Sequence, residues 1–507
     1  MSGGIAQAAT LADHLPVLVL LVPFVSAPLV VLAGWRRLSW WLAFAASAAS
    51  FAIASVLLGR VLSAGVISYH IGGWAPPWGI EYRIDAANGF VLMLVSALST
   101  VVLPFARQSI AKEVAARHHT LFYAMWLLCL AGLLGVTVTG DAFNVFVFLE
   151  VSSLSTYVLV SLGAGRDRRA LTAAYDYLIM GTTGATFFVI GIGFLYAATG
   201  TLNMADIARQ IAANGADRTV ETAFAFIVVG LGLKAAVYPL HLWLPNAYTY
   251  APSAVTSFVA ATATKVAIYA LLRFMFTIFR PDFLFELHAL DLIMVPLALL
   301  AMFAASLIAV FQTDFKRMLA YSSIAQIGYI LLGIGFLSRT GLSAAVIHLF
   351  NHAITKGTLF MGVGIFVWKC GSSFYGRIEG MGRVMPFTSL AVVLAGFSLI
   401  GLPGTAGFVS KWLLVQAAIE SGAWMLALAV VASSLLAVVY VWRVIETLYM
   451  KTPEAGLRRG EAPLSMLIPL WIGALATIWF GFSTEVTLSS ATAAARALLE
   501  GFSGLVQ

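Results

Sequence analysis

The segment GLKAAVYPLHLWLP, Gly232 to Pro245, combines a lysine, a histidine and two prolines with an otherwise apolar sequence. Pro239 and Pro245 lack the backbone N–H that a continuous α-helix requires, so they should interrupt a helix at this point. Lys234 carries a charge, which costs about 2.5–3.5 kcal/mol at the centre of a bilayer unless it is paired or hydrated. An interrupted helix with a buried lysine therefore predicts a functional element within a membrane.

The whole chain has the composition of a membrane protein. Of its 507 residues, 61% are hydrophobic and 10% are charged, and the mean hydropathy is +0.95. This apolar content exceeds what a single soluble core needs. Apolar runs of about 20 residues, long enough to cross a bilayer, recur along the chain. We therefore expect an all-α polytopic membrane protein of about 14 transmembrane helices, without a soluble domain.

The expected helices follow from the apolar runs, with the interruption of the first paragraph inside the seventh. We place them near residues 15–34, 38–59, 86–105, 119–138, 142–163, 171–198, 222–248, 254–278, 288–311, 319–337, 341–369, 386–420, 424–450 and 463–483.

The charge distribution predicts the topology. The formal net charge is +7, and most Lys and Arg residues fall in alternate expected loops, such as 164–170 and 312–318, whereas the opposite loops carry few. The positive-inside rule then places the basic loops in the cytoplasm and both termini on the outer side of a bacterial-type inner (plasma) membrane. Because topology explains the excess positive charge, nucleic-acid binding has no remaining support.

Several charged side chains fall within the apolar runs. Glu150, in FNVFVFLEVSSLSTY, is the clearest acidic group, with Ser153 and Tyr157 on the same helical face, and Asp176 is a further candidate near a helix end. Ionisable groups inside a membrane usually mark ion pathways, although a static ion pair between Glu150 and a lysine is the alternative. Four lysines share this setting: Lys234, Lys265, Lys356 and Lys411.

The segment HLFNHAITKGTLF, which begins at His348, adds two histidines to this set. His348, His352 and Lys356 are spaced i, i+4, i+8, which places them along one face of a helix. Histidine changes protonation near neutral pH, so such a face can pass protons if water bridges the groups. Two core histidines bonded to backbone carbonyls are the alternative. We expect no metal, because no glutamate follows the first histidine and no further ligand lies nearby.

A second interruption, GLPGTAGFVS, directly precedes Lys411. Pro403 and Gly404 should break this helix as Pro239 breaks the first, and His241 lies within the first break. Interrupted helices at corresponding positions in two halves of a chain are typical of inverted repeats with ion sites at the breaks. Two unrelated kinks are the alternative.

Together these motifs resemble the antiporter-like subunits shared by respiratory complex I and Mrp-type multisubunit cation/proton antiporters. The resemblance covers roughly residues 85–450 and rests on GDAFNVFVFLEVSSLS, GLKAAVYPLHLWLPNAYTYAPSAV, DFKRMLAYSSIAQIGY, HLFNHAITKGTLFM and GLPGTAGFVSKW. It implies two inverted five-helix repeats, each with a broken helix. The implied divisions are 1–118 for helices 1–3, 119–278 and 279–450 for the two repeats, and 451–507 for the last helix and tail.

The resemblance also implies roles for the buried groups. Glu150 would pair with Lys234, Lys265 would be the next station of a mid-membrane proton path, and Lys411 would be its far end. The two histidines and Lys356 would connect these parts. Many relatives have a second proline where this chain has Gly404 and Thr405.

The surroundings of Glu150 are most similar to the D subunit of Mrp antiporters. The expected function is proton translocation within a Na⁺ or K⁺/proton antiporter of several membrane subunits. The alternative is a pump subunit of a complex I-like NADH-quinone oxidoreductase, or of a related hydrogenase or carbon-uptake complex. The chain has two cysteines and no dinucleotide fingerprint, so we expect an ion-transport subunit without its own redox centre or cofactor. An inert scaffold would leave the four buried lysines unexplained.

Overall fold

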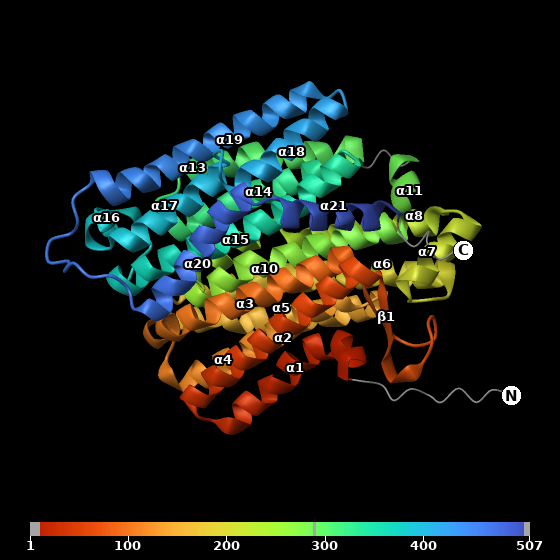
Figure 1. The fold of residues 1–507 in the computed structure, drawn as a ribbon, viewed down its shortest axis with the longest axis horizontal. Coiled ribbons are helices and arrows are strands. Elements are labelled where there is room, and N and C mark those ends of the chain that lie inside the picture. The colour runs from red at the N-terminus through yellow and green to blue at the C-terminus, as the bar shows by residue number, and fades with distance from the viewer. Residues whose placement is uncertain (1–10, 287–289, 501–507) are drawn as a thin grey trace.

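The computed structural model describes residues 11–286 and 290–500 as a bundle of long helices with one small hairpin (Figure 1). Within this described part, twelve helices are long and apolar enough to cross a membrane. The N-terminal part comprises α1 (Leu15–Ala33), α2 (Arg36–Ala64) and α3 (Ala86–Glu113), with the antiparallel strands β1 (Ile67–His70) and β2 (Glu81–Ile84) between α2 and α3.

The middle of the chain forms two further groups of helices. The first group is α4 (His119–Val138), α5 (Ala142–Ser161), α6 (Arg169–Thr199), α7 (Met204–Asn214), α8 (Arg218–Ala235), α9 (Trp243–Tyr250) and α10 (Ser253–Leu272). The second group is α11 (Arg280–Glu286), α12 (Val295–Leu300), α13 (Ser306–Val310), α14 (Phe315–Gly335), α15 (Arg339–Cys370), α16 (Met381–Val384), α17 (Pro386–Ile400), α18 (Ala406–Glu420) and α19 (Trp424–Ile445).

Four π-helical stretches extend or join these helices in the described part of the chain, namely Arg273–Ile278 after α10, Leu290–Met294 before α12, Ala301–Ala305 between α12 and α13, and Glu446–Met450 after α19. The chain then forms α20 (Leu464–Phe482) and α21 (Glu485–Glu500), and α21 packs against α3 and α15. The hairpin, α7 and α11 lie at one end of the bundle, and α16 lies at the opposite end (Figure 1).

The predicted polytopic helical fold is confirmed, with a different count of continuous spans. Twelve of the fourteen expected spans coincide with the twelve continuous ones. The other two, near 222–248 and 386–420, are each divided into two shorter helices, α8 with α9 and α17 with α18. The hairpin, the amphipathic α7 and the C-terminal α21 were not expected, because none of them contains a long apolar run.

The first break follows from backbone conformation at Ala236 as much as from proline. Helix α8 ends at Ala235, and Ala236 adopts a left-handed conformation with φ 56°. Pro239 lies in the turn that follows, whereas Pro245 lies in the first turn of α9, where a missing N–H leaves no bond unmade. At the second break Gly401 has φ 88°, and Pro403 and Gly404 lie between α17 and α18.

Candidate functional site

The first broken helix holds Lys234 in the last turn of α8. Its Nζ lies 2.9 Å from Oε1 of Glu150 and donates to Oγ of Ser153 at 2.8 Å. The lysine side chain is 5% exposed and the glutamate side chain is 20% exposed. The C-terminal end of a helix favours a positive charge, so the end of α8 adds to the stabilisation from Glu150.

Aromatic side chains close the first break against the neighbouring helices. Nε1 of Trp243 donates to the backbone oxygen of Leu233 at 3.0 Å, which satisfies a carbonyl near the end of α8. The same indole stacks on Tyr177 of α6 with ring centres 3.9 Å apart. Tyr157 of α5 contacts Tyr177 edge-on at 4.7 Å. These contacts link α9 to α5 and α6.

The second broken helix surrounds Lys411 with neutral oxygens. Nζ of Lys411 donates to the backbone oxygens of Leu399 at 3.2 Å and Ile400 at 2.8 Å, and to Oγ of Ser434 at 3.1 Å. The two backbone oxygens belong to the last turn of α17, where the break leaves them without intrahelical partners. The same Nζ lies 4.6 Å from the ring centre of Tyr329, within the range of a cation–π contact.

Helix α15 carries three buried groups at the centre of the bundle. His348 is bonded at both ring nitrogens, to Oγ of Ser410 at 2.9 Å and to Oε1 of Gln326 at 3.0 Å. His352 stacks on His348 with ring centres 6.2 Å apart. Both ring nitrogens of His352 are buried without a hydrogen-bond partner among the described residues. Buried polar atoms are usually satisfied, so this site suits bound water.

The two remaining lysines also lack a carboxylate within ion-pair distance in the described part of the chain. Nζ of Lys356 donates to the backbone oxygen of Leu319 at 2.8 Å and to Oγ of Ser322. Nζ of Lys265 donates to the backbone oxygen of Ala260 at 2.6 Å.

Lys265 lies near enough to interact electrostatically with His348, His352 and Lys356. Helices α10, α14 and α15 therefore gather one cluster of basic groups. Lys411 lies near enough to His348 to interact electrostatically with it, and Ser410, the residue before Lys411, bonds His348. Among the described residues, no hydrogen bond or ion pair joins Lys234 to Lys265.

Two of the candidate residues lie away from this cluster. Asp176 is partly exposed on α6, in an open hollow with Trp243 and Asn246. His241 lies in the turn of the first break and stacks on Tyr238 with ring centres 4.8 Å apart. Neither forms an ion pair with a described residue.

Sequence reasoning missed a second buried ion pair. Nη2 of Arg273, near the end of α10, lies 2.5 Å from Oδ1 of Asp85, which caps α3. Burial would raise the pKa of Asp85, but the Arg273 guanidinium and the backbone N–H groups at the start of α3 hold it below its ordinary value. Hydropathy places Arg273 within an expected span, but its partner lies outside the apolar runs, where hydropathy carries no signal.

Comparison with known proteins places this geometry in a family. The sequence model described as "NADH:quinone oxidoreductase/Mrp antiporter, TM" matches residues 139–437. The chain belongs to this family. The matched region includes both broken helices and all seven residues of the expected path. The family predicted from the sequence motifs is thus confirmed.

Relatives of this chain include a subunit of an NADH-quinone oxidoreductase and subunits of Na⁺/H⁺ antiporters. The chain is 40% identical to the N subunit of the NADH-quinone oxidoreductase of Desulforudis audaxviator, over 94% of this chain and 97% of that protein. It is 30% identical to the D subunit of the Na⁺/H⁺ antiporter of Alkalihalophilus pseudofirmus, over 93% and 94% respectively. It is 29% identical to the D subunit of the Na⁺/H⁺ antiporter of Bacillus subtilis, over 96% and 97%.

Solved structures show the same fold over nearly the whole chain. A chain of the Mrp complex from Dietzia sp. DQ12-45-1b matches with a TM-score of 0.89 at 27% identity, covering 97% of this chain and 98% of that one. A chain of the membrane-bound sulfane sulfur reductase, an archaeal respiratory membrane complex, matches with a TM-score of 0.87 at 30% identity, covering 98% and 99%. With its twelve long apolar helices in the described part and its family, this chain is a multi-pass membrane protein.

Proposed function

We propose that the chain translocates protons as a membrane subunit of a multisubunit monovalent cation/proton antiporter. The observation that carries the proposal is the burial of the four lysines Lys234, Lys265, Lys356 and Lys411, of which Lys234 alone has a carboxylate partner in the described part of the chain. Each buried lysine is costly in hydrocarbon, so a static role is poorly supported. The basic cluster and both lysines at the breaks provide successive proton-binding groups.

The ion pair at the first break supplies a means of coupling. An opposite charge stabilises the ammonium form of lysine, so moving the Glu150 carboxylate away from Lys234 favours release of the lysine proton. Ser153 bonds the same ammonium and offers a partner while the carboxylate moves. Protons then pass through water to Lys265 and the α15 histidines, and Lys411 is the far end of the path.

An exposed face of α5 supports the proposal that other membrane subunits pack against this chain. Phe143, Val147 and Leu154 are exposed on this face, and Glu150 falls on the same stripe at a spacing of seven residues from Phe143. A carboxylate directed at lipid is unfavourable, whereas a neighbouring subunit would shield it. We place this complex in a bacterial-type inner membrane, with the basic loops in the cytoplasm.

Two matching helix starts support inverted repeats over 119–278 and 279–450. Asp141 begins α5 by accepting from the backbone N of Asn144 at 2.7 Å, and Asp314 begins α14 by accepting from the backbone N of Arg317 at 3.0 Å. Each aspartate also forms an isolated bridge to the segment after the next helix, Asn203 after α6 and Phe374 after α15. Those segments lead to α7 and α16, at opposite ends of the bundle (Figure 1).

A second candidate function is a pump subunit of a quinone-linked redox complex. The relative that is 40% identical over 94% of this chain is named as a subunit of an NADH-quinone oxidoreductase, and this similarity favours that alternative. Both functions use the same path and differ in the source of energy.

The test measures dissipation of a pH gradient in inverted vesicles that contain the complete assembly. Addition of Na⁺ or K⁺ should dissipate the gradient with the wild-type chain, and Lys234→Ala and Lys411→Ala should each abolish the response. NADH-dependent pumping is measured in parallel. Undiminished cation response in both variants would refute the path, and loss of NADH-linked pumping without any cation response would select the redox complex.

A further inference from the structure

An apolar groove of about 350 Å³ lies beside the first broken helix. One wall is α8, and the other is α12 with the π-helical stretch Leu290–Met294 that precedes it. Leu271 of α10 and Leu331 of α14 form its buried floor. Among its lining side chains in the described part of the chain, only those of Glu221 and Tyr238 carry an oxygen or nitrogen atom. The groove is therefore suited to a hydrocarbon occupant.

The groove opens toward the surroundings of the bundle. On the α8 wall Val229 is 37% exposed, and on the opposite wall Ile293 is 59% exposed. Ala225 and Pro239 also line the groove and are exposed. In a multi-pass membrane protein, apolar side chains exposed along a spanning segment face hydrocarbon. The groove is thus open to the bilayer.

The length of the groove matches one leaflet of a bilayer. It begins beside Glu221, in the first turn of α8, and continues past Gly232 to the turn at Pro239. The separation of Glu221 and Gly232 is about 16 Å along the helix axis. The hydrocarbon core of a bilayer is about 30 Å thick, so one leaflet supplies about half of that thickness. An acyl chain that begins beside Glu221 therefore ends at the break.

Two opposite charges lie where the groove begins, on the side of the hairpin and α7 (Figure 1). Arg218 and Glu221 are both exposed in the first turn of α8, three residues apart and hence on one helical face. Neither forms an ion pair with a described residue. A carboxylate accepts from an ammonium group, and a guanidinium donates to a phosphate. Phosphatidylethanolamine carries an ammonium and a phosphate in one headgroup.

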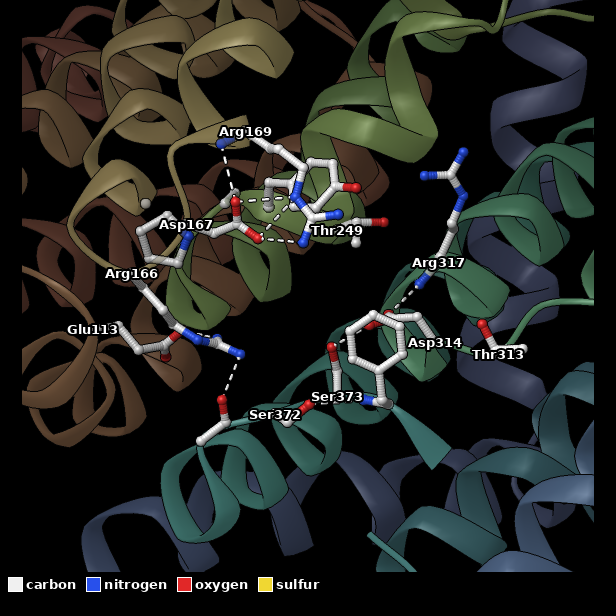
Figure 2. Close-up of a pocket in the computed structure, with 16 residues that line it drawn as sticks. Glu113, Arg166, Asp167, Arg169, Thr249, Thr313, Asp314, Arg317, Ser372 and Ser373 are labelled. Carbon is white, nitrogen blue, oxygen red and sulfur yellow. Dashed lines mark hydrogen bonds and ion pairs between the residues drawn. The ribbon is translucent and has the colours of Figure 1, made fainter. Parts of the chain in front are cut away.

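A polar cavity of about 390 Å³ at the opposite end of the bundle has a contrasting lining (Figure 2). Oε2 of Glu113 lies 3.3 Å from Nη1 of Arg166, and Oδ2 of Asp167 lies 2.7 Å from Nη2 of Arg169. Lys316, buried beside this cavity, adds a further charged group. Water needs such hydrogen-bonding partners, and a hollow lined by apolar side chains lacks them. The groove beside α8 therefore favours hydrocarbon over water.

The inner end of the groove is the turn of the first break. Val237, Tyr238 and Leu240 line it, and Lys234 precedes them in the last turn of α8. The backbone N of Val237 donates to the backbone oxygen of Gly232 at 2.9 Å, so this N–H needs no partner from the groove. Dispersion contacts with a hydrocarbon chain would replace those that an empty groove leaves unmade. An acyl chain in the groove thus packs directly against the break.

We propose that this groove binds one acyl chain of phosphatidylethanolamine, with Glu221 and Arg218 at the headgroup. The carboxylate holds the ammonium, the guanidinium holds the phosphate, and the end of the chain packs against the turn that follows Lys234. The hairpin and α7 lie on the outer side in the topology proposed above, so the lipid belongs to the outer leaflet. This binding site goes beyond proton translocation and does not depend on it.

The first test asks whether lipid reaches the buried floor of the groove. The complete assembly is placed in vesicles of phosphatidylethanolamine and phosphatidylglycerol, with a trace of phosphatidylethanolamine that carries a photoreactive diazirine in its acyl chain. After illumination, peptide mass spectrometry should find the adduct on Leu271 or Leu331. Val229→Trp fills the groove and should abolish this labelling. Val431→Trp is the matched control, because Val431 is 50% exposed on α19 and lies outside the groove, and it should leave the labelling unchanged.

The second test compares headgroups and remains valid if Val229→Trp fails to assemble. The same photoreactive chain is supplied on phosphatidylethanolamine or on phosphatidylglycerol, which has no ammonium. Labelling of the floor should be about two- to fivefold stronger with phosphatidylethanolamine, as expected for one exposed ion pair. Glu221→Gln should remove this preference. Glu485→Gln, which changes an exposed carboxylate in the first turn of α21, should preserve it.

Each contrary outcome removes a defined part of the proposal. Absence of adducts on the floor in the wild-type assembly would overturn it and would indicate that a protein segment covers the groove. Floor labelling that persists in Val229→Trp would also overturn the acyl-chain site. Equal labelling with both headgroups, or a preference that survives Glu221→Gln, would overturn the headgroup assignment. The vesicle assay of Lys234→Ala and Lys411→Ala tests the proposed function separately.

Discussion

The two broken helices hold their lysines in different ways. At the first break, Lys234 precedes the interruption and contacts a carboxylate, Glu150. At the second, Lys411 follows the interruption and reaches back to two backbone oxygens of α17 and the hydroxyl of Ser434. A carboxylate favours the charged lysine far more than neutral oxygens do. The two breaks thus differ in the charge of the groups that surround the lysine, with a carboxylate at the first and neutral oxygens at the second.

The largest effect on stability is expected when a side-chain partner of the buried lysine is removed at each break. Glu150→Gln leaves the ammonium of Lys234 buried without its counter-charge, which should destabilise the protein by about 3–5 kcal/mol. Ser434→Ala removes one of three neutral acceptors of Lys411 and should cost about 1–2 kcal/mol. Thermal unfolding of the purified complex compares the two variants. Equal losses would show that Glu150 acts as a neutral partner does.

A smaller effect tests how tightly each break is packed. A Cβ at Gly407, in the first turn of α18, would overlap the backbone oxygen of Ser398, so Gly407→Ala should cost about 3 kcal/mol or more by overpacking. A Cβ at Gly181 would meet the hydroxyl of Tyr157, the far end of a side chain, so Gly181→Ala should cost about 1 kcal/mol. The same unfolding assay applies. A larger loss in Gly181→Ala would reverse the comparison.

The smallest expected effect concerns the left-handed residue at each break. Gly401 has φ 88°, and an added Cβ would lie 2.8 Å from Cδ of Lys411, so Gly401→Ala should destabilise by about 1–2 kcal/mol. Ala236 already adopts φ 56° with its Cβ in place, so Ala236→Gly should relieve up to about 1 kcal/mol of strain. The thermal unfolding midpoint should therefore fall in Gly401→Ala and rise in Ala236→Gly. Shifts of the same sign would contradict this account.

Much of the fold could be predicted from local sequence features. Long apolar runs located twelve continuous spans, because membrane insertion depends on the hydropathy of each segment by itself. Proline and glycine located both breaks for a similarly local reason. The hairpin, α7 and α21 were not predicted, since they are short or amphipathic and form through packing against other helices.

Partners of the buried charges could be predicted only in part. The motif resemblance paired Glu150 with Lys234, but nothing local indicated that Arg273 contacts Asp85, a residue 188 positions away. Lys316 falls in a predicted loop because a polar neighbourhood in sequence does not reveal burial by distant segments. Its bond to the backbone oxygen of Ala251, the residue that follows α9, arises from the packing of α9 against α14.

The sequence by itself determined that this is a polytopic helical membrane protein of the antiporter-like family, with two interrupted helices and four lysines in apolar spans. These properties follow from hydropathy, backbone chemistry and motif identity, all of which are read along the chain. Only the tertiary structure decided which oxygen atoms surround each lysine. Side-chain partners depend on helix packing, which brings together residues that are far apart in sequence.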